Sequence, residues 1–232
     1  MEDLDQKNSQ GYQDHKIDSK SKGKDHENVW QKRSEDDVAY QRQAQLTWWT
    51  LMGGIALGAL LTQFDQLLAE TRVGNWHFFF YFFATCFVII NSWIQTAWGA
   101  LVLCWPISVV SSLILFFGNL SCSIAALSIT IPGRWMAGMA GVVLFAVLMQ
   151  LHFKKQQGWI TLTQDAIKRA NLGIVVYIGL FFLLLVMAAL LTIFPSQLLE
   201  ILFGILTLLF SSLALYWQHL GMQQEKADLH ID

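Results

Sequence analysis

The chain has 232 residues, of which 54% are hydrophobic and only 14% are Asp, Glu, Lys or Arg. A soluble globular chain is about a quarter charged, so this composition argues against an ordinary soluble domain. The formal net charge of −2 also argues against a nucleic-acid or polyanion partner, because no basic stripe is available to neutralise phosphates.

Charged residues are concentrated at the N-terminus. Residues 1–45 hold eight of the 15 Lys and Arg and ten of the 17 Asp and Glu. Residues 1–33 have hardly an apolar side chain and cannot bury enough surface to offset the entropy of ordering, so we expect a disordered cytoplasmic tail. The first apolar run begins only at Leu46, so the sequence predicts no signal peptide.

The first membrane helix is expected from about residue 35 to residue 69, with Ser34 as its N-cap and a crossing at about 47–68. Gly54 and Gly58 form a GxxxG spacing within this crossing. In lipid, small residues at this spacing let a second backbone approach closely. We therefore expect helix packing at these two glycines, against a helix of this chain or of another subunit.

A long uncharged stretch follows. No Asp, Glu, Lys or Arg occurs in the 61 residues from Val73 to Gly133. One helical crossing takes about 20 apolar residues, so this stretch is long enough for two crossings and a turn. We place the crossings at about 76–103 and 107–131, with a break at Pro106, because proline cannot continue the preceding helix.

Uncharged polar side chains gather in these two helices. Asn119 lies near the middle of the third crossing by count, and a lone amide facing lipid is costly, so it should face another helix or water. Two interpretations stay open: hydrogen bonds between helices that hold the bundle together, or a polar lining for ions or a small solute. The residues concerned are Asn91, Ser92, Gln95, Ser112 and Asn119.

Three further crossings are predicted at about 135–153, 171–194 and 197–217. They complete a membrane domain over residues 34–219, followed by a short cytoplasmic tail at 220–232. The fourth crossing carries a small-residue face that indicates close helix packing. The positions concerned are Gly138 and Gly141.

Ionisable groups are sparse in the predicted bundle. Glu200 lies in the first turn of the last crossing, near the positive end of the helix dipole, and we expect it at the water interface rather than buried. Cys86, Cys104 and Cys122 lie in apolar segments without a CxxC pair, so we expect buried free thiols. Catalytic motifs, cofactor motifs and metal-ligand spacings are missing, so the sequence predicts no enzyme activity, cofactor or metal site.

Six crossings place both termini on the same side of a membrane. The connection at 154–170 carries four Lys or Arg, whereas the short loops on the opposite side carry only Arg72 and Arg134. Positively charged loops stay on the cytoplasmic side, so we expect both termini in the cytoplasm. The predicted fold class is therefore all-α: a polytopic membrane protein of six transmembrane helices.

Two functional classes fit these features. The first is a structural or regulatory component of a membrane assembly, favoured by the small-residue faces and by a first helix that would protrude from the membrane. Its partners would be the lipid bilayer, further copies of the chain or other membrane proteins. The alternative is an oligomeric channel or permeation subunit, favoured by the uncharged polar line of the second and third helices.

Overall fold

The computed structural model describes residues 40, 43–44, 46–101, 108–155 and 164–229. The predicted disordered tail at 1–33, the predicted N-cap Ser34, Cys104 and Pro106 lie outside the described residues. The chain divides into two compact units, 1–44 and 45–232. The second unit contains the helical bundle.

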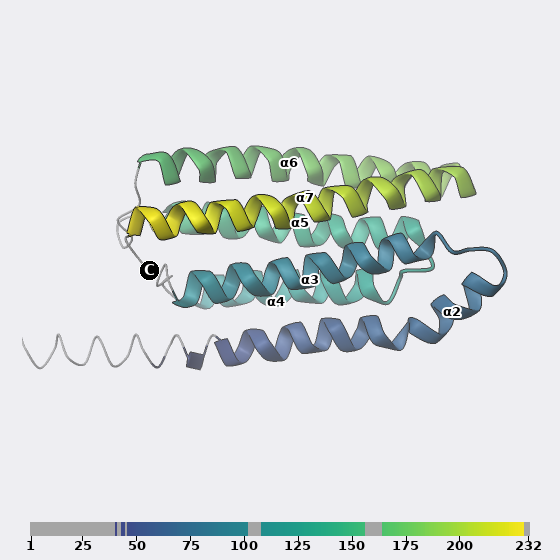
Figure 1. Ribbon diagram of the computed structural model, residues 1–232, viewed down its shortest axis with the longest axis horizontal. Coiled ribbons are helices and arrows are strands. Elements are labelled where there is room, and N and C mark those ends of the chain that lie inside the picture. The colour runs from purple at the N-terminus through teal and green to yellow at the C-terminus, as the bar shows by residue number, and fades with distance from the viewer. Residues whose placement is uncertain (1–39, 41–42, 45, 102–107, 156–163, 230–232) are drawn as a thin grey trace, which may run out of the picture. The chain divides into compact units, whose positions relative to one another are not determined.

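Every regular element in the described part of the chain is a helix, which confirms the all-α prediction (Figure 1). Six segments are long and apolar enough to cross a membrane, as a multi-pass membrane protein requires. These segments are Leu46–Arg72, Phe78–Trp98, Val109–Ala126, Pro132–His152, Asn171–Ile193 and Gln197–Gln224. The labelled helices are α2 (Phe64–Arg72), α3 (Phe78–Leu101), α4 (Val109–Ala126), α5 (Pro132–Lys155), α6 (Gln164–Ile193) and α7 (Gln197–Leu229).

The first membrane-length segment is interrupted, whereas the sequence predicted one continuous helix. Residues 46–62, the first membrane helix below, are helical, and α2 follows after a turn at Gln63. The amide of Gln63 donates to the carbonyl of Leu60 at 3.1 Å. This bond reaches back three residues instead of four, which tightens the backbone as in a 3₁₀ turn. Accordingly, α2 leaves the line of the preceding helix (Figure 1).

The third crossing is shorter than predicted, because α4 ends at Ala126. In the residues that follow, the amide of Ser128 donates to the carbonyl of Ala125, and the amide of Ile131 donates to the carbonyl of Ser128, both at 2.9 Å. Bonds across three residues close turns and do not continue an α-helix. α5 then begins at Pro132, a first-turn position where the missing proline N–H leaves no bond unmade.

The two ends of the bundle differ in what they carry (Figure 1). The short-loop end carries the connections 73–77, 127–131 and 194–196. At the other end, the tail end, residue 46 begins the first membrane helix and α7 finishes at Leu229. Most of the segment predicted as a separate tail, 220–232, is therefore a continuation of α7.

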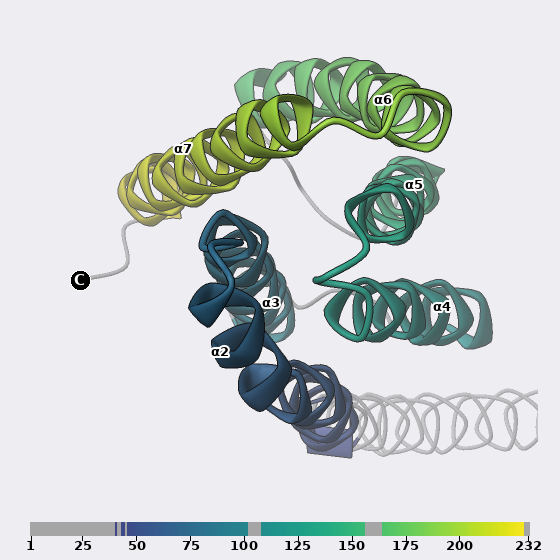
Figure 2. The same ribbon diagram turned by 90° about the vertical axis from the view of Figure 1, so that its right-hand side faces the viewer.

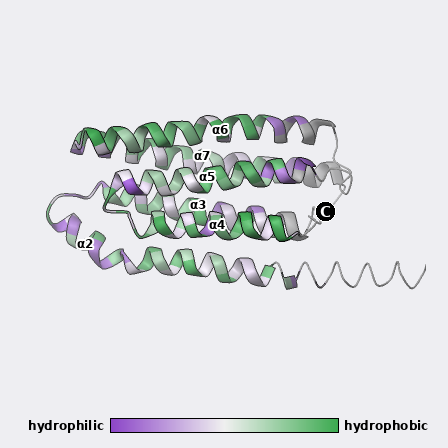
Figure 3. Ribbon diagram, turned by 180° about the vertical axis from the view of Figure 1, so that it is seen from behind, coloured by the Kyte–Doolittle hydropathy of each residue, from purple (hydrophilic) through white to green (hydrophobic). Residues whose placement is uncertain are grey.

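Within the bundle, α5 lies between α4 and α6, and α3 packs along α7 (Figure 2). Toward the short-loop end, the fully buried rings of Tyr81 and Trp135 meet edge to face with centroids 4.9 Å apart. Large apolar side chains such as Val175, Phe182 and Leu198 are exposed on the outward faces. Figure 3 shows hydrophobic residues along much of the helices and hydrophilic ones toward some helix ends. This surface suits contact with lipid better than contact with water.

Candidate functional site

A cavity of about 200 Å³ lies inside the bundle, and each of the six membrane-length segments contributes to its wall. Among the described residues, no Asp, Glu, Lys or Arg lines it. Many lining side chains are aliphatic or aromatic, and the others are uncharged. The uncharged polar residues in the wall include Trp49, Asn91, Ser92, Gln95, Thr96, Asn119, Gln150, Tyr177, Thr207 and Ser211.

Contacts between helices show the depth of Asn119. Trp135 Nε1 of α5 donates to Thr85 Oγ1 of α3 at 2.8 Å, so these two residues lie near the same level of two parallel helices. Gly118 packs against α5 ten residues beyond Trp135, where an added Cβ would lie 3.3 Å from its neighbour. Ten residues beyond Thr85 is Gln95. Asn119 and Gln95 therefore lie at about the same depth, a closer match than counting along the sequence had indicated.

The cavity has a polar part and an apolar part. The polar zone lies toward the tail end, because its residues sit in the tail-end half of their helices or level with that half. It consists of Trp49, Asn91, Gln95, Asn119 and Gln150. The apolar zone lies toward the short-loop end and consists of Ala84, Cys122, Met139, Leu184 and Met187. The cavity is thus amphipathic along the axis of the bundle.

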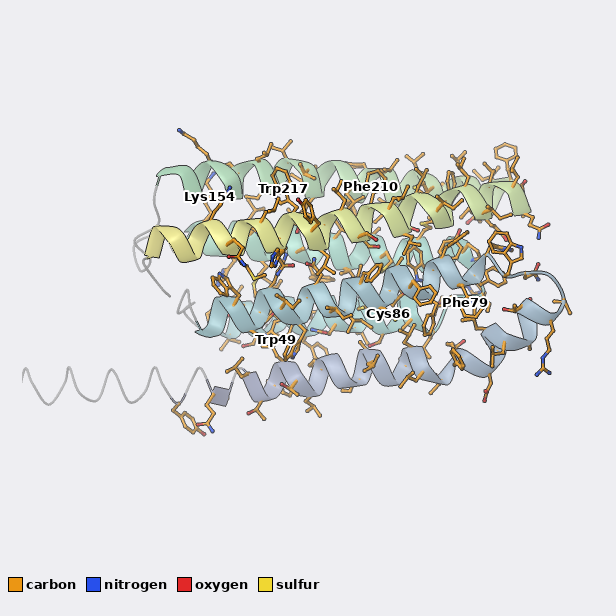
Figure 4. The ribbon with its side chains drawn as sticks, in the orientation of Figure 1. Trp49, Phe79, Cys86, Lys154, Phe210 and Trp217 are labelled. Atoms are coloured by element: carbon orange, nitrogen blue, oxygen red, sulfur yellow. The ribbon has the colours of Figure 1, made fainter. Side chains whose placement is uncertain are left out.

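Several groups in the polar zone have no hydrogen-bond partner. Trp49 is 5% exposed, its side chain lies between the first membrane helix and α3 (Figure 4), and its Nε1 donates to nothing. Asn91 Oδ1 is also buried and accepts from nothing. The side chains of Gln95 and Gln150 make no hydrogen bond with any residue that the structure describes. Buried polar groups are normally paired, so this zone has unused capacity for hydrogen bonds.

Four of the five polar residues singled out from the sequence line this cavity: Asn91, Ser92, Gln95 and Asn119. The fifth, Ser112, is half-buried on α4 and lies away from it. Asn119 Nδ2 donates to the carbonyl of Leu115 in its own helix at 3.0 Å. Within the described residues, no side-chain hydrogen bond of these five joins two helices. Other residues form the polar links between helices.

The four glycines singled out for helix packing fall into two pairs. A Cβ on Gly138 would lie 2.9 Å from the Cβ of Ala125, and one on Gly141 would lie 2.8 Å from Ser121 Oγ. These two glycines lie where α4 and α5 approach most tightly. Gly54 and Gly58 are exposed on the first membrane helix, and a Cβ there would meet no described atom within 4 Å.

A polar cluster at the short-loop end joins α3 to α7. His77 is 1% exposed, and its Nε2 lies 3.0 Å from Glu200 Oε2. Tyr81 Oη donates to the backbone carbonyl of Glu200 at 2.6 Å. Glu200 is 24% exposed, so the carboxylate expected at the water interface is partly buried and paired. The pairing could have been found by noting that both residues begin helices at the same end of the bundle.

This cluster continues to the cavity wall. Thr85 Oγ1 donates to the backbone carbonyl of Tyr81 at 2.7 Å and accepts from Trp135 Nε1 at 2.8 Å. Trp135 in turn lines the cavity. Each buried polar group in this chain of bonds has a partner, in contrast to the polar zone.

Ionisable and sulfur groups are placed as follows. Cys122 is buried and Cys86 half-buried, and both are free thiols. Among the described residues, no three His, Cys, Asp or Glu side chains come together in a way that could hold a metal ion. The arrangement can therefore hydrogen-bond a neutral guest and enclose its apolar part.

Comparison with known proteins found no matching family model, curated protein or solved structure.

Proposed function

We propose that this chain is a non-catalytic, structural or regulatory component of a membrane assembly, with both termini in the cytoplasm. The observation that supports this proposal is the open face of the first membrane helix. Gly54 and Gly58 are exposed there and meet no other described residue. Without side chains, both positions leave room for the backbone of a partner helix.

Neighbouring positions fit the same role. Ala56 and Leu60 are buried against the rest of the bundle, so one side of the first membrane helix is occupied. A shallow groove runs along the open side, where Thr50, Leu51 and Gly54 line it. A helix from a second subunit would fill this groove by van der Waals contact, the main source of helix association in lipid.

The mass of the complex extracted in mild detergent tests the proposal. We expect wild-type complexes heavier than the single chain of 26.4 kDa, and a shift to that mass when Gly54 and Gly58 are both replaced by Leu. Gly179→Leu is the matched control, because Gly179 is an exposed glycine on α6 with no atom within 4 Å of its would-be Cβ. Wild-type protein at the mass of one chain would count against an assembly.

A permeation subunit is the second candidate. The uncharged polar residues of the cavity favour it, since they line a space to which α3 and α4 both contribute. Planar-bilayer recordings with purified protein distinguish the two candidates. Ion currents that Asn119→Leu abolishes would favour permeation, whereas silent bilayers with an intact assembly would favour the structural or regulatory role.

A further inference from the structure

We infer that the amphipathic cavity binds a small neutral amphiphile: a molecule with one uncharged hydrogen-bonding group and an apolar body of alcohol-like chemistry. The hydrogen-bonding group lies in the polar zone and the apolar body in the apolar zone. This inference goes beyond the proposed function, because a component of a membrane assembly needs no ligand of its own.

Trp49 provides the first argument. Its side chain is 95% buried by the exposure given above, it lines the cavity, and its Nε1–H has no acceptor. A buried donor without an acceptor is unfavourable, and an indole has no other conformational means of reaching water from inside a bundle. An acceptor oxygen of a guest would complete this bond.

The side-chain amides provide the second argument. Asn91 Oδ1 is a buried acceptor without a donor, and the amides of Gln95 and Gln150 are unpaired within the described residues. An amide offers both donors and acceptors, so these residues suit a hydroxyl group, which also donates and accepts. Three unpaired amides beside an unpaired indole on the wall of one cavity form a built site rather than a chance void.

Charge excludes ionic guests. The described wall holds no Asp, Glu, Lys or Arg to compensate an ion. A buried charge without a counter-charge is strongly unfavourable, whereas a neutral hydroxyl needs only hydrogen bonds. The same argument separates an alcohol from the carboxylate or ammonium of equal chain length.

Volume limits the size of the guest. An apolar cavity of about 150 Å³ is known to hold one benzene molecule. The cavity here is about 200 Å³, somewhat larger. A medium-chain alcohol such as 1-octanol is a suitable probe, because its hydroxyl can reach the polar zone while its chain occupies the apolar zone. A whole membrane lipid would not fit within this volume.

Photolabelling of the purified full chain in lipid nanodiscs tests the inference. The probe is a diazirine analogue of 1-octanol, and labelled residues are located by mass spectrometry. We expect saturable labelling at apolar-zone residues such as Met139 and Met187. Unlabelled 1-octanol should compete at least tenfold more effectively than octane, and octanoate should not compete.

Variants locate the site. Gln95→Leu and Trp49→Phe should each reduce saturable labelling several-fold, because each removes a hydrogen-bonding group and keeps an apolar side chain. The matched controls are Gln223→Leu and Trp217→Phe, at exposed positions of α7 outside the cavity. Val88→Phe, which adds volume inside the cavity, should reduce labelling without removing a polar group. Thermal unfolding of each variant checks that the bundle is intact.

Three results would overturn the inference. Labelling that does not saturate, or that falls mainly on exposed residues such as Phe182, would indicate partition from the bilayer. Equal competition by octane and 1-octanol would mean that the polar zone holds only water. Unchanged labelling in correctly folded Gln95→Leu and Trp49→Phe would show that these groups do not contact the guest.

Discussion

His77 and Glu200 show how two ionisable residues can be accommodated inside an apolar bundle. His77 is almost completely buried, and Glu200 supplies its partner across 3.0 Å. The backbone carbonyl of Glu200 also accepts from Tyr81, so the start of α7 is joined to α3 at two points. A polar group that loses its only partner inside such a bundle has no water to replace it.

Glu200→Leu should therefore lower the free energy of unfolding by about 1–3 kcal/mol, because it leaves the buried His77 Nε2 without its partner. Glu200→Gln should cost less, since the amide can still bond the imidazole. Asp65→Asn, at an exposed carboxylate of α2, is the control and should change little. Thermal unfolding in detergent measures all three, and equal losses for Glu200→Leu and Glu200→Gln would contradict the role of the hydrogen bond.

At the scale of single residues, the sequence identified the right polar side chains but not their partners. Asn91, Ser92, Gln95 and Asn119 were selected as uncharged polar residues in apolar helices, and they do line one cavity. The sequence placed Glu200 at the water interface because a carboxylate in a first turn usually lies there. Its pairing with His77 depends on the contact between α3 and α7, which no local pattern reveals.

At the scale of helices, close approach depends on which glycines meet a neighbour. Gly138 lies against Ala125, where an added Cβ would come 2.9 Å from a backbone nitrogen as well as from the Ala125 Cβ. A backbone atom cannot move aside as the end of a flexible side chain can. The same small-residue spacing at Gly54 and Gly58 leads to open space. Spacing alone therefore does not distinguish an internal contact from an outward face.

Gly138→Ala should lower the free energy of unfolding by about 1–3 kcal/mol, because overpacking forces α4 and α5 apart. Gly173→Ala on α6 is the matched control, since an added Cβ there meets no atom within 4 Å. It should be neutral or stabilise the helix by up to about 1 kcal/mol, because alanine loses less backbone entropy than glycine. Denaturant titration in micelles compares the two variants, and similar behaviour would argue against the tight contact.

Helix boundaries were predicted to within a few residues where hydropathy changes sharply, as at the start of α7 (Gln197). They were less accurate where the chain stays apolar through a turn. α4 ends at Ala126 and the first segment breaks at Gln63, although neither place carries a proline or a glycine. The three-residue hydrogen bonds that close these turns result from packing around them, so local sequence gave no signal.

For the whole molecule, the proposed orientation rests on the charge of the connections. Lys154 and Lys155 lie at the tail end of α5, whereas Arg72 and Arg134 lie at the short-loop end. Cysteine introduced at Lys155 should react with a membrane-impermeant maleimide only after the cells are opened, and cysteine at Arg72 should react in intact cells. Both variants are made in a background without the native cysteines. Labelling of the Lys155 position from outside would reverse the orientation.

The sequence by itself determined that this chain forms six apolar helices, because the length and hydropathy of each helix are properties of one continuous segment. It also determined that the interior is rich in uncharged polar groups and poor in charge. Only the tertiary structure decided which of those groups share a cavity, which of them lack partners, and which glycines touch a neighbour. The physical reason is that depth and facing depend on how helices far apart in the chain pack, and an amide such as Gln95 looks the same in the sequence whether it is paired or open.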